Sequence, residues 1–349
     1  MKLAPSVPLT ERKIRLSKPA IVWILLLLPF ALAMVAMTIG RYQISVLDTV
    51  KILLSPISPA YAGDIPEVAK RLVLQIRAPR ILAALLIGAS FGATGTAFQA
   101  IFKNPLVDSN ILGVTTGAGF GAAIAILLRG THWQIQISAF LFGLLAVSLS
   151  FFGSRLYKAT PLLVLTLMGI LVGSLFSSLT ALLKYMADPL DSLPAITFWL
   201  LGSLTNITWR SLPVLAAIAL TGLVFFWFLG WRFNIISLGD EEAKSLGINP
   251  VHMKMMIIFA ATLMTAAAVS ISGVIGWVGL VIPHAGRMMV GPDHKRLIPA
   301  TIGLGAAFLL LIDLIARALL PGEIPLGVLT GLVGVPLLMG LLRKNRTGW

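Results

Sequence analysis

Ten long apolar segments dominate this sequence and decide what kind of chain it can be. Most approach the roughly 20 apolar residues that a helix needs to cross a bilayer. Hydrophobic residues make up 58% of the 349 and charged residues 11%, against about a quarter charged in a soluble domain. These values exclude a soluble enzyme and a disordered chain, and the absence of cysteine excludes a disulfide scaffold.

The composition therefore predicts an all-α polytopic membrane protein with about ten transmembrane helices, forming a single domain over residues 1–349. Several later segments are interrupted by glycine and proline, as at Gly273, Pro283 and Pro336, so short or broken helices are expected inside a compact bundle. The expected spans are residues 20–39, 81–102, 107–128, 133–153, 160–183, 211–230, 251–270, 273–290, 297–319 and 325–342.

Positive charge is distributed unevenly between the two sides that this topology defines. With the N-terminus inside, 17 Lys and Arg are cytoplasmic and 4 are outside, apart from the long connection over residues 41–80. Both termini are therefore expected in the cytoplasm, with residues 1–18 as a cytoplasmic N-terminal segment rather than a cleavable signal. The net charge of +14 is better explained by anionic lipid head groups than by nucleic acid.

Chemistry-bearing residues are scarce within the spans. Buried carboxylates would indicate an ion-coupled carrier, and the sequence has almost none at mid-depth. Asp313 and Arg317 lie one helical turn apart, which favours a local ion pair near the outer interface. The four histidines are scattered, so no metal site and no catalytic constellation are predicted. No phosphate-binding Gly-x-x-x-x-Gly-Lys-Ser/Thr loop occurs, so ATP could act only through another subunit.

The one acidic cluster occurs between the sixth and seventh segments, over residues 238–249. The pattern predicts a short cytoplasmic helix, because acids suit the first turn and Gly247 is a natural stop. A helix lying on lipid would carry Lys and Arg instead, so a cytoplasmic protein partner is favoured. The predicted contact residues are Leu238, Gly239, Asp240, Glu241, Glu242, Ala243, Lys244, Ser245, Leu246 and Gly247.

That acidic segment resembles the coupling-helix motif of type II ATP-binding-cassette (ABC) importer permeases for vitamin B12, haem and ferric siderophores. Further stretches are similar to the same family, in the same order, over about residues 40–342. They are Gln75-Ile-Arg-Ala-Pro-Arg80, Gln99-Ala-Ile-Phe-Lys-Asn-Pro-Leu106, the stretches 273–287 and 291–296, Asp313-x-x-x-Arg317 and Glu323-Ile-Pro-Leu-Gly327. Trp277 stands where phenylalanine is more usual in the family.

The resemblance implies a homodimer in the inner membrane, with the transport path along the dimer interface. Two ATPase subunits would dock on residues 238–249, and these subunits, not this chain, would bind ATP and magnesium. A periplasmic or lipid-anchored substrate-binding protein would dock outside on Arg77, Arg80 and Arg317. Membrane-interface anchoring is the alternative role for Arg77 and Arg80. Leu162 and Leu163 would form a cytoplasmic gate. The chain itself would be no enzyme and would hold no cofactor.

The cargo is less determined than the family. A ferric siderophore or haem is expected first, because most permeases of this family carry iron chelates. Cobalamin or an oxyanion is the alternative within the family, and an ion-coupled secondary transporter is the alternative outside it.

Overall fold

The computed structural model describes residues 17–40, 42–58, 61, 63–156, 161–319 and 322–344. Nearly all of the expected cytoplasmic N-terminal segment, residues 1–16, lies outside the described residues. A helix occupies each of the ten predicted segments. These are α1 (Lys18–Thr38), α4 (Ala78–Phe102), α5 (Val114–Leu127), α6 (His132–Ser154), α7 (Pro161–Met186), α9 (Leu212–Phe228), α12 (Pro250–Ser272), α13 (Val278–Val290), α14 (His294–Ala318) and α15 (Leu326–Lys344).

Length separates these helices into two groups. Within the described residues, seven spans are long and apolar enough to cross a membrane, and α9 with α10 (Gly230–Leu238) makes an eighth if that pair, bent by 63°, is one span. The α5 and α13 helices have 14 and 13 residues. At 1.5 Å per residue each is about 20 Å long, shorter than the roughly 30 Å hydrocarbon layer. The predicted all-helical membrane fold is confirmed, with seven or eight candidate spans in the described residues and with α5 and α13 shorter than the hydrocarbon layer.

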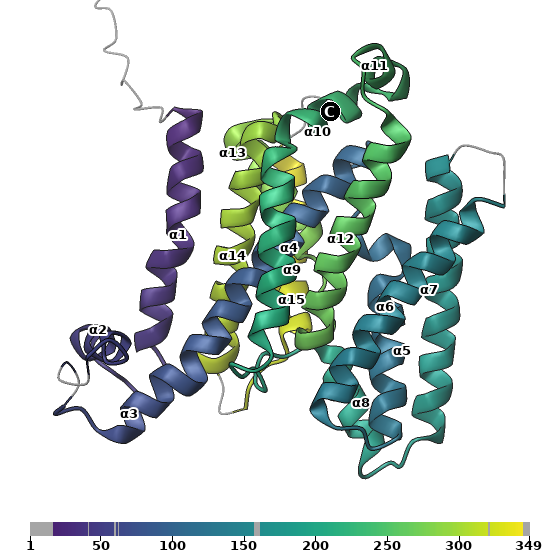
Figure 1. Ribbon diagram of the computed structural model, residues 1–349. Coiled ribbons are helices and arrows are strands. Elements are labelled where there is room, and N and C mark those ends of the chain that lie inside the picture. The colour runs from purple at the N-terminus through teal and green to yellow at the C-terminus, as the bar shows by residue number, and fades with distance from the viewer. Residues whose placement is uncertain are drawn as a thin grey trace, which may run out of the picture.

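Short helices cover both ends of the bundle (Figure 1). Helix α11 (Asp240–Ser245) projects at the end where α1 begins, and α10 leads into it. The opposite end carries α2 (Val46–Leu54), α3 (Glu67–Arg71) and α8 (Ser192–Leu201). A π-helix, Leu72–Arg77, continues α3 into α4. The positive charge distribution makes the α11 end cytoplasmic and the α2, α3 and α8 end the outer one.

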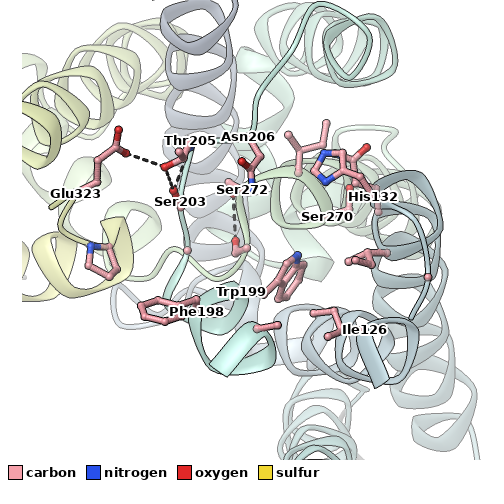
Figure 2. A pocket seen from close by; sticks show the side chains of 18 of the residues that line it. Ile126, His132, Phe198, Trp199, Ser203, Thr205, Asn206, Ser270, Ser272 and Glu323 are labelled. Carbon is pink, nitrogen blue, oxygen red and sulfur yellow. Dashed lines mark hydrogen bonds between the residues drawn. The ribbon is translucent and has the colours of Figure 1, made fainter. Parts of the chain in front are cut away.

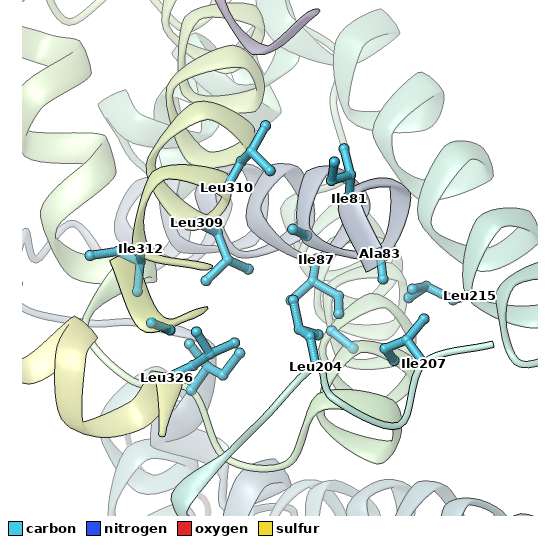
Figure 3. Packing of buried hydrophobic residues seen from close by; sticks show 14 of the residues in the cluster. Ile81, Ala83, Ile87, Leu204, Ile207, Leu215, Leu309, Leu310, Ile312 and Leu326 are labelled. Carbon is cyan, nitrogen blue, oxygen red and sulfur yellow. The ribbon is translucent and has the colours of Figure 1, made fainter. Parts of the chain in front are cut away.

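The α4 and α14 helices pack against each other along most of their lengths. A Cβ on Gly88 would collide with the carbonyl oxygen of Gly305, and a Cβ on Gly92 with that of Thr301. Thr96 donates a hydrogen bond to the hydroxyl of Thr301 over 3.0 Å. Lipid gives helices no hydrophobic reason to associate, so this close approach and its dispersion contacts hold the pair together. Figure 3 shows the apolar packing beside it, where Ile87 of α4 lies near Leu309 of α14.

The chain between α12 and α13 is non-helical, as the glycines there predict. Gly273 and Trp277 both have left-handed backbone, with φ of 69° and 70°. The amide of Ser203, in the loop after α8, donates to the carbonyl of Ser272 over 2.8 Å. Non-helical backbone at membrane depth requires such partners, because lipid offers none. The break therefore lies against protein and, as described below, beside a cavity.

Candidate functional site

The acidic segment forms the predicted helix, α11, at the cytoplasmic end. Its first turn contains Asp240, Glu241 and Glu242, and Gly247 follows it with φ of 77°. The amide of Gly247 donates to the carbonyl of Lys244, and the amide of Ile248 donates to that of Ala243, each over 2.9 Å. These bonds satisfy carbonyls that the end of the helix would otherwise leave free.

Only one face of α11 is held by the bundle. Ala243 is fully buried in the apolar core, while Glu241 and Glu242 are exposed. Lys244 bonds to Glu241 over 2.9 Å, and this bond raises the pKa of the Lys244 ammonium group. The segment therefore exposes acidic side chains to the cytoplasm while its opposite face, with Ala243, is buried against the bundle. This geometry suits a protein contact.

Three polar contacts join the acidic segment and α10 to the long helices. Lys103, which follows α4, donates to the carbonyl of Leu238 over 2.8 Å. Lys254 of α12 pairs with Asp240 at 2.5 Å. Asn234 of α10 donates to Asp293, just before α14, over 2.7 Å. Burial alone would raise the pKa of Asp293, but the bonds from Asn234 and from the Lys295 amide outweigh it and lower that pKa.

Sequence reasoning missed these anchoring residues. Lys103, Asn234, Lys254 and Asp293 are ordinary polar residues in or next to helices, and their partners lie 14 to 135 positions away along the chain. Lys103 does lie within a stretch that carried the family resemblance, and Asp293 within another. That coincidence was the only sequence signal for them.

At the outer end, Arg80 contacts two carboxylates. Its Nη1 and Nη2 donate to the two carboxylate oxygens of Glu323, both over 2.8 Å, and its Nε donates to Asp313 over 2.9 Å. The Arg80 side chain is 7% exposed, Asp313 0% and Glu323 33%. The planar guanidinium matches a carboxylate with two parallel bonds, the strongest geometry for such a pair.

The other two predicted docking arginines bind the end of α1. Arg77 donates to the carbonyls of Met37 and Tyr42, each over 2.5 Å. Arg317 donates to the carbonyl of Ala36 over 2.5 Å, and its Nε lies 3.7 Å from Asp313. The predicted Asp313–Arg317 ion pair is therefore present, although Arg80 lies closer to that carboxylate. The structure brings all three arginines together, and each also has a partner within the chain.

Two hollows meet beside Glu323. The arginine hollow has a volume of about 560 Å³ and is lined by Arg77, Arg80, Arg317 and Glu323 among others. The vestibule, about 520 Å³, is lined by α8 and the loop after it, the start of α6, the end of α12 with Gly273, and the loop before α15. Figure 2 shows Ser203, Thr205, Asn206, Ser270 and Ser272 around it, with Trp199 and Phe198 beside them. Such a mixture of apolar walls and a few polar groups is typical of ligand-binding cavities.

Thr205 and Glu323 line both hollows. Thr205 donates to Glu323 over 2.7 Å, and burial, which by itself would raise the pKa of Glu323, is outweighed by the bonds from Arg80 and Thr205. The pKa of Glu323 is therefore lowered, and its carboxylate is ionised at neutral pH.

The predicted gate residues lie in the first turn of α7, at the cytoplasmic end. Leu162 is partly buried against the core, and Leu163 is exposed. A gate at these residues stays a prediction, because a single subunit does not define the transport path. Within the part of the chain that the structure describes, no group of three or more His, Asp or Glu is placed to hold a metal ion.

The helical bundle with its candidate membrane spans is that of an ABC importer permease, a multi-pass protein of the inner membrane. The chain belongs to the FecCD transport family, whose model matches residues 25–344. It is 40% identical over 332 residues to the molybdate import permease MolB of Haemophilus influenzae. The aligned residues cover 95% of this chain and 98% of that protein.

Other relatives are named for different cargoes. A probable iron chelatin permease of Helicobacter pylori is 38% identical over 79% of this chain and 83% of its own length. A solved structure titled as an inward-facing conformation of a putative metal-chelate type ABC transporter matches with a TM-score of 0.84 and 38% identity, covering 93% of this chain and 99% of that one. The predicted family is confirmed, and its relatives divide among several cargoes.

Proposed function

We propose that this chain is the membrane subunit of an importer driven by a separate ATPase, with α10 and α11 as the coupling segment. The observation that carries the proposal is the acidic surface of α11, which is exposed on one face, while Asp240 ties α11 to α12 and the preceding α10 is tied to the ends of α4 and α14. A motor that moved α11 would move three long helices together, because polar contacts link the segment to each of them. ATP and magnesium would bind to that motor and not to this chain.

Two copies of this chain would form the transport unit, with the path between them. The family resemblance supports this arrangement, and the apolar surface of α7, with Leu163, Leu167 and Leu171 exposed, is free to face lipid or a second copy. Crosslinking of the permease in native membranes would test it. Single cysteines introduced on α7 are suited to this, since the chain contains no other cysteine.

The outer arginines would receive carboxylates of a substrate-binding protein. Three guanidinium groups line the arginine hollow against the two carboxylates of Asp313 and Glu323, which leaves one positive charge in excess. Arg77 contributes most to that excess, since the bonds described for it all go to main-chain carbonyls. Charge of this sign would speed and orient the approach of an acidic partner surface.

For the cargo, we propose an oxyanion of the molybdate class before a ferric chelate. The MolB relative supports this order, because it matches nearly the full length of both chains, whereas the iron chelatin relative matches 79% of this one. The vestibule is lined by hydroxyl and amide groups, by His132 and by the Glu323 carboxylate, whose charge is paired with Arg80, and it has no Lys or Arg. Hydroxyl and amide donors of that kind would bind an oxyanion weakly, so that it could leave again. The solved metal-chelate type structure keeps a ferric siderophore or haem as the second candidate.

Uptake into proteoliposomes would test the proposal. The permease would be reconstituted with its ATPase and binding protein, and molybdate, haem and a ferric hydroxamate would be supplied in turn. ATP-dependent molybdate uptake is the expected result. Uptake of haem or of the ferric complex, without uptake of molybdate, would favour the second candidate as the cargo. Uptake that needs an ion gradient and no ATPase would overturn the function.

A matched pair of variants would test the coupling segment. Replacing the exposed Glu241 and Glu242 by lysine should abolish ATPase binding, because it reverses the charge of the docking face. Glu67→Lys makes the same type of change at the opposite end of the bundle, where the side chain is 74% exposed, and should leave ATPase binding unchanged. Equal ATPase binding by both variants would contradict the assignment of α11.

A further inference from the structure

The two carboxylates on Arg80 differ in their surroundings. Asp313 is completely buried on α14, whereas Glu323 lies in the loop before α15 with a third of its side chain exposed. Removing Asp313 from its guanidinium would leave a charge in the protein interior, which is costly. Glu323 could leave Arg80 and meet water instead. The Nη1 and Nη2 groups of Arg80 are therefore bonded to Glu323, the partner that can be exchanged for another carboxylate.

The position of Glu323 links the arginine hollow to the vestibule. Its two carboxylate oxygens bind Arg80, and one of them also accepts the hydroxyl proton of Thr205. Thr205 belongs to the loop that follows α8, which bonds to the α12 break through Ser203 and to Leu326 through Gly202. Figure 2 shows Glu323 bonded to Thr205 at the edge of the vestibule. Since the same carboxylate binds Arg80, it joins α4 to the loop after α8 and to its own loop before α15.

An incoming carboxylate would meet a hollow that attracts it, but the bidentate face of Arg80 is already bonded to Glu323. Arg77 donates to carbonyls at the end of α1 and in the loop after it, Arg317 donates to one carbonyl of α1, and Nη1 and Nη2 of Arg80 are both bonded to Glu323. A second bidentate pair on Arg80 can form only if Glu323 moves away. When it does, the bond to Thr205 breaks as well, because the same carboxylate makes both contacts.

We propose that Glu323 occupies, within the free permease, the place on Arg80 that a carboxylate of the docked binding protein takes, so that docking by exchange releases the two loops at the mouth of the vestibule. This inference rests on the proposed function, since it needs an acidic protein partner on the outer face. It adds that Glu323 opposes docking and that the same exchange opens the vestibule.

Affinity measurements on permease in nanodiscs would test the exchange. The probe is the purified substrate-binding protein that the wild-type permease retains. Glu323→Gln removes the competing charge while keeping the side-chain shape, and should tighten docking about fivefold or more. Glu67→Gln removes an equal charge from the same face without touching Arg80, and should change docking less than twofold. Thr205→Val, which removes only one bond to Glu323, should tighten docking by a smaller factor than Glu323→Gln.

A second measurement reports on the vestibule. Because the chain has no cysteine, Ser270→Cys places a single thiol on the vestibule wall at a buried position. A charged thiol reagent should label it faster once the binding protein docks. In the Glu323→Gln background it should label at the faster rate before docking.

The outcomes separate this inference from the proposed function. If Glu323→Gln weakens docking or leaves it unchanged, or if labelling stays slow in that background, Glu323 is not an exchangeable stand-in and the inference is overturned. If the wild-type permease retains no binding protein at all, the proposed function itself fails.

Discussion

Asp313 of α14 lies fully buried 2.9 Å from the Nε of Arg80 on α4, and this ion pair joins the two central helices at their outer ends. Glycine contacts join the same helices at mid-depth. At the cytoplasmic end, Lys103 after α4 and Asp293 before α14 both contact α10, the first helix of the coupling segment. Two helices therefore run from the predicted binding-protein face to the predicted ATPase face.

Replacing Arg80 by methionine should destabilise the fold strongly. The buried carboxylate of Asp313 would keep only Arg317, at 3.7 Å, so its charge would be poorly compensated. Breaking a buried pair in this way costs about 3–5 kcal/mol. Urea or thermal unfolding in detergent micelles would measure the loss. Arg71→Met, at an exposed position on α3, is the control and should change stability by less than about 0.5 kcal/mol. Equal stability of the two variants would show that the pair contributes nothing.

Gly88→Ala should separate α4 from α14. The added Cβ would meet the carbonyl of Gly305, and neither backbone can yield locally. Overpacking of this kind costs about 1–3 kcal/mol. Gly340→Ala on α15 is the matched control, because nothing lies within 4 Å of a Cβ built there. It should be neutral or stabilising by up to about 1 kcal/mol, as alanine favours a helix. Thermal unfolding of both variants in the same detergent would measure the difference. Equal unfolding midpoints would contradict this prediction.

Much of this fold could be predicted from the sequence, because lipid imposes strict rules. Apolar length located the ten helices, and the Lys and Arg distribution gave their orientation. The acids and Gly247 located α11 to within a few residues. The partner of α4 could not be predicted, because nothing in Gly88 itself indicates that Gly305 lies against it.

The outer site could be predicted only in part. Arg77, Arg80 and Arg317 were found through the family resemblance, and the structure does place them together. Their internal partners were not foreseen, because Glu323 lies 243 positions from Arg80 and Ala36 lies 281 from Arg317. Local patterns carry no information about pairing over such distances. The role of these arginines in docking, the gate at Leu162 and Leu163, and the single-domain organisation stay predictions.

Lys254→Met should loosen the coupling segment without unfolding the protein. Lys254 lies on α12 and its side chain is 12% exposed, so its bond to Asp240 ties α11 to another helix. An ion pair of this exposure contributes up to about 1 kcal/mol, which corresponds to roughly fivefold faster hydrogen exchange. Mass-spectrometric exchange over residues 240–248 would measure this change. Lys244→Met is the control, because Lys244 pairs with Glu241 inside α11 itself and its loss should speed exchange less. Equal rates in the two variants would assign no anchoring role to Lys254.

The contribution of Glu323 to stability should depend on pH with a defined sign. Its pKa in the folded protein is below the ordinary value of 4.5, because the bonds from Arg80 and Thr205 outweigh the opposite effect of burial. The folded state therefore holds this proton less tightly than the unfolded chain does. The stabilisation is fully present above pH 4.5 and is lost as the pH falls through the lowered pKa.

Comparison with Glu323→Gln over a pH series would isolate this effect, because glutamine resembles the protonated carboxyl group. From pH 8 to about 5, the wild-type protein should unfold about 1–3 °C above the variant, by a constant margin. Below about pH 4.5 the two unfolding curves should converge. A margin that instead grew on acidification would mean that folding raises the pKa of Glu323, and the ion pair with Arg80 would then not be what stabilises the carboxylate.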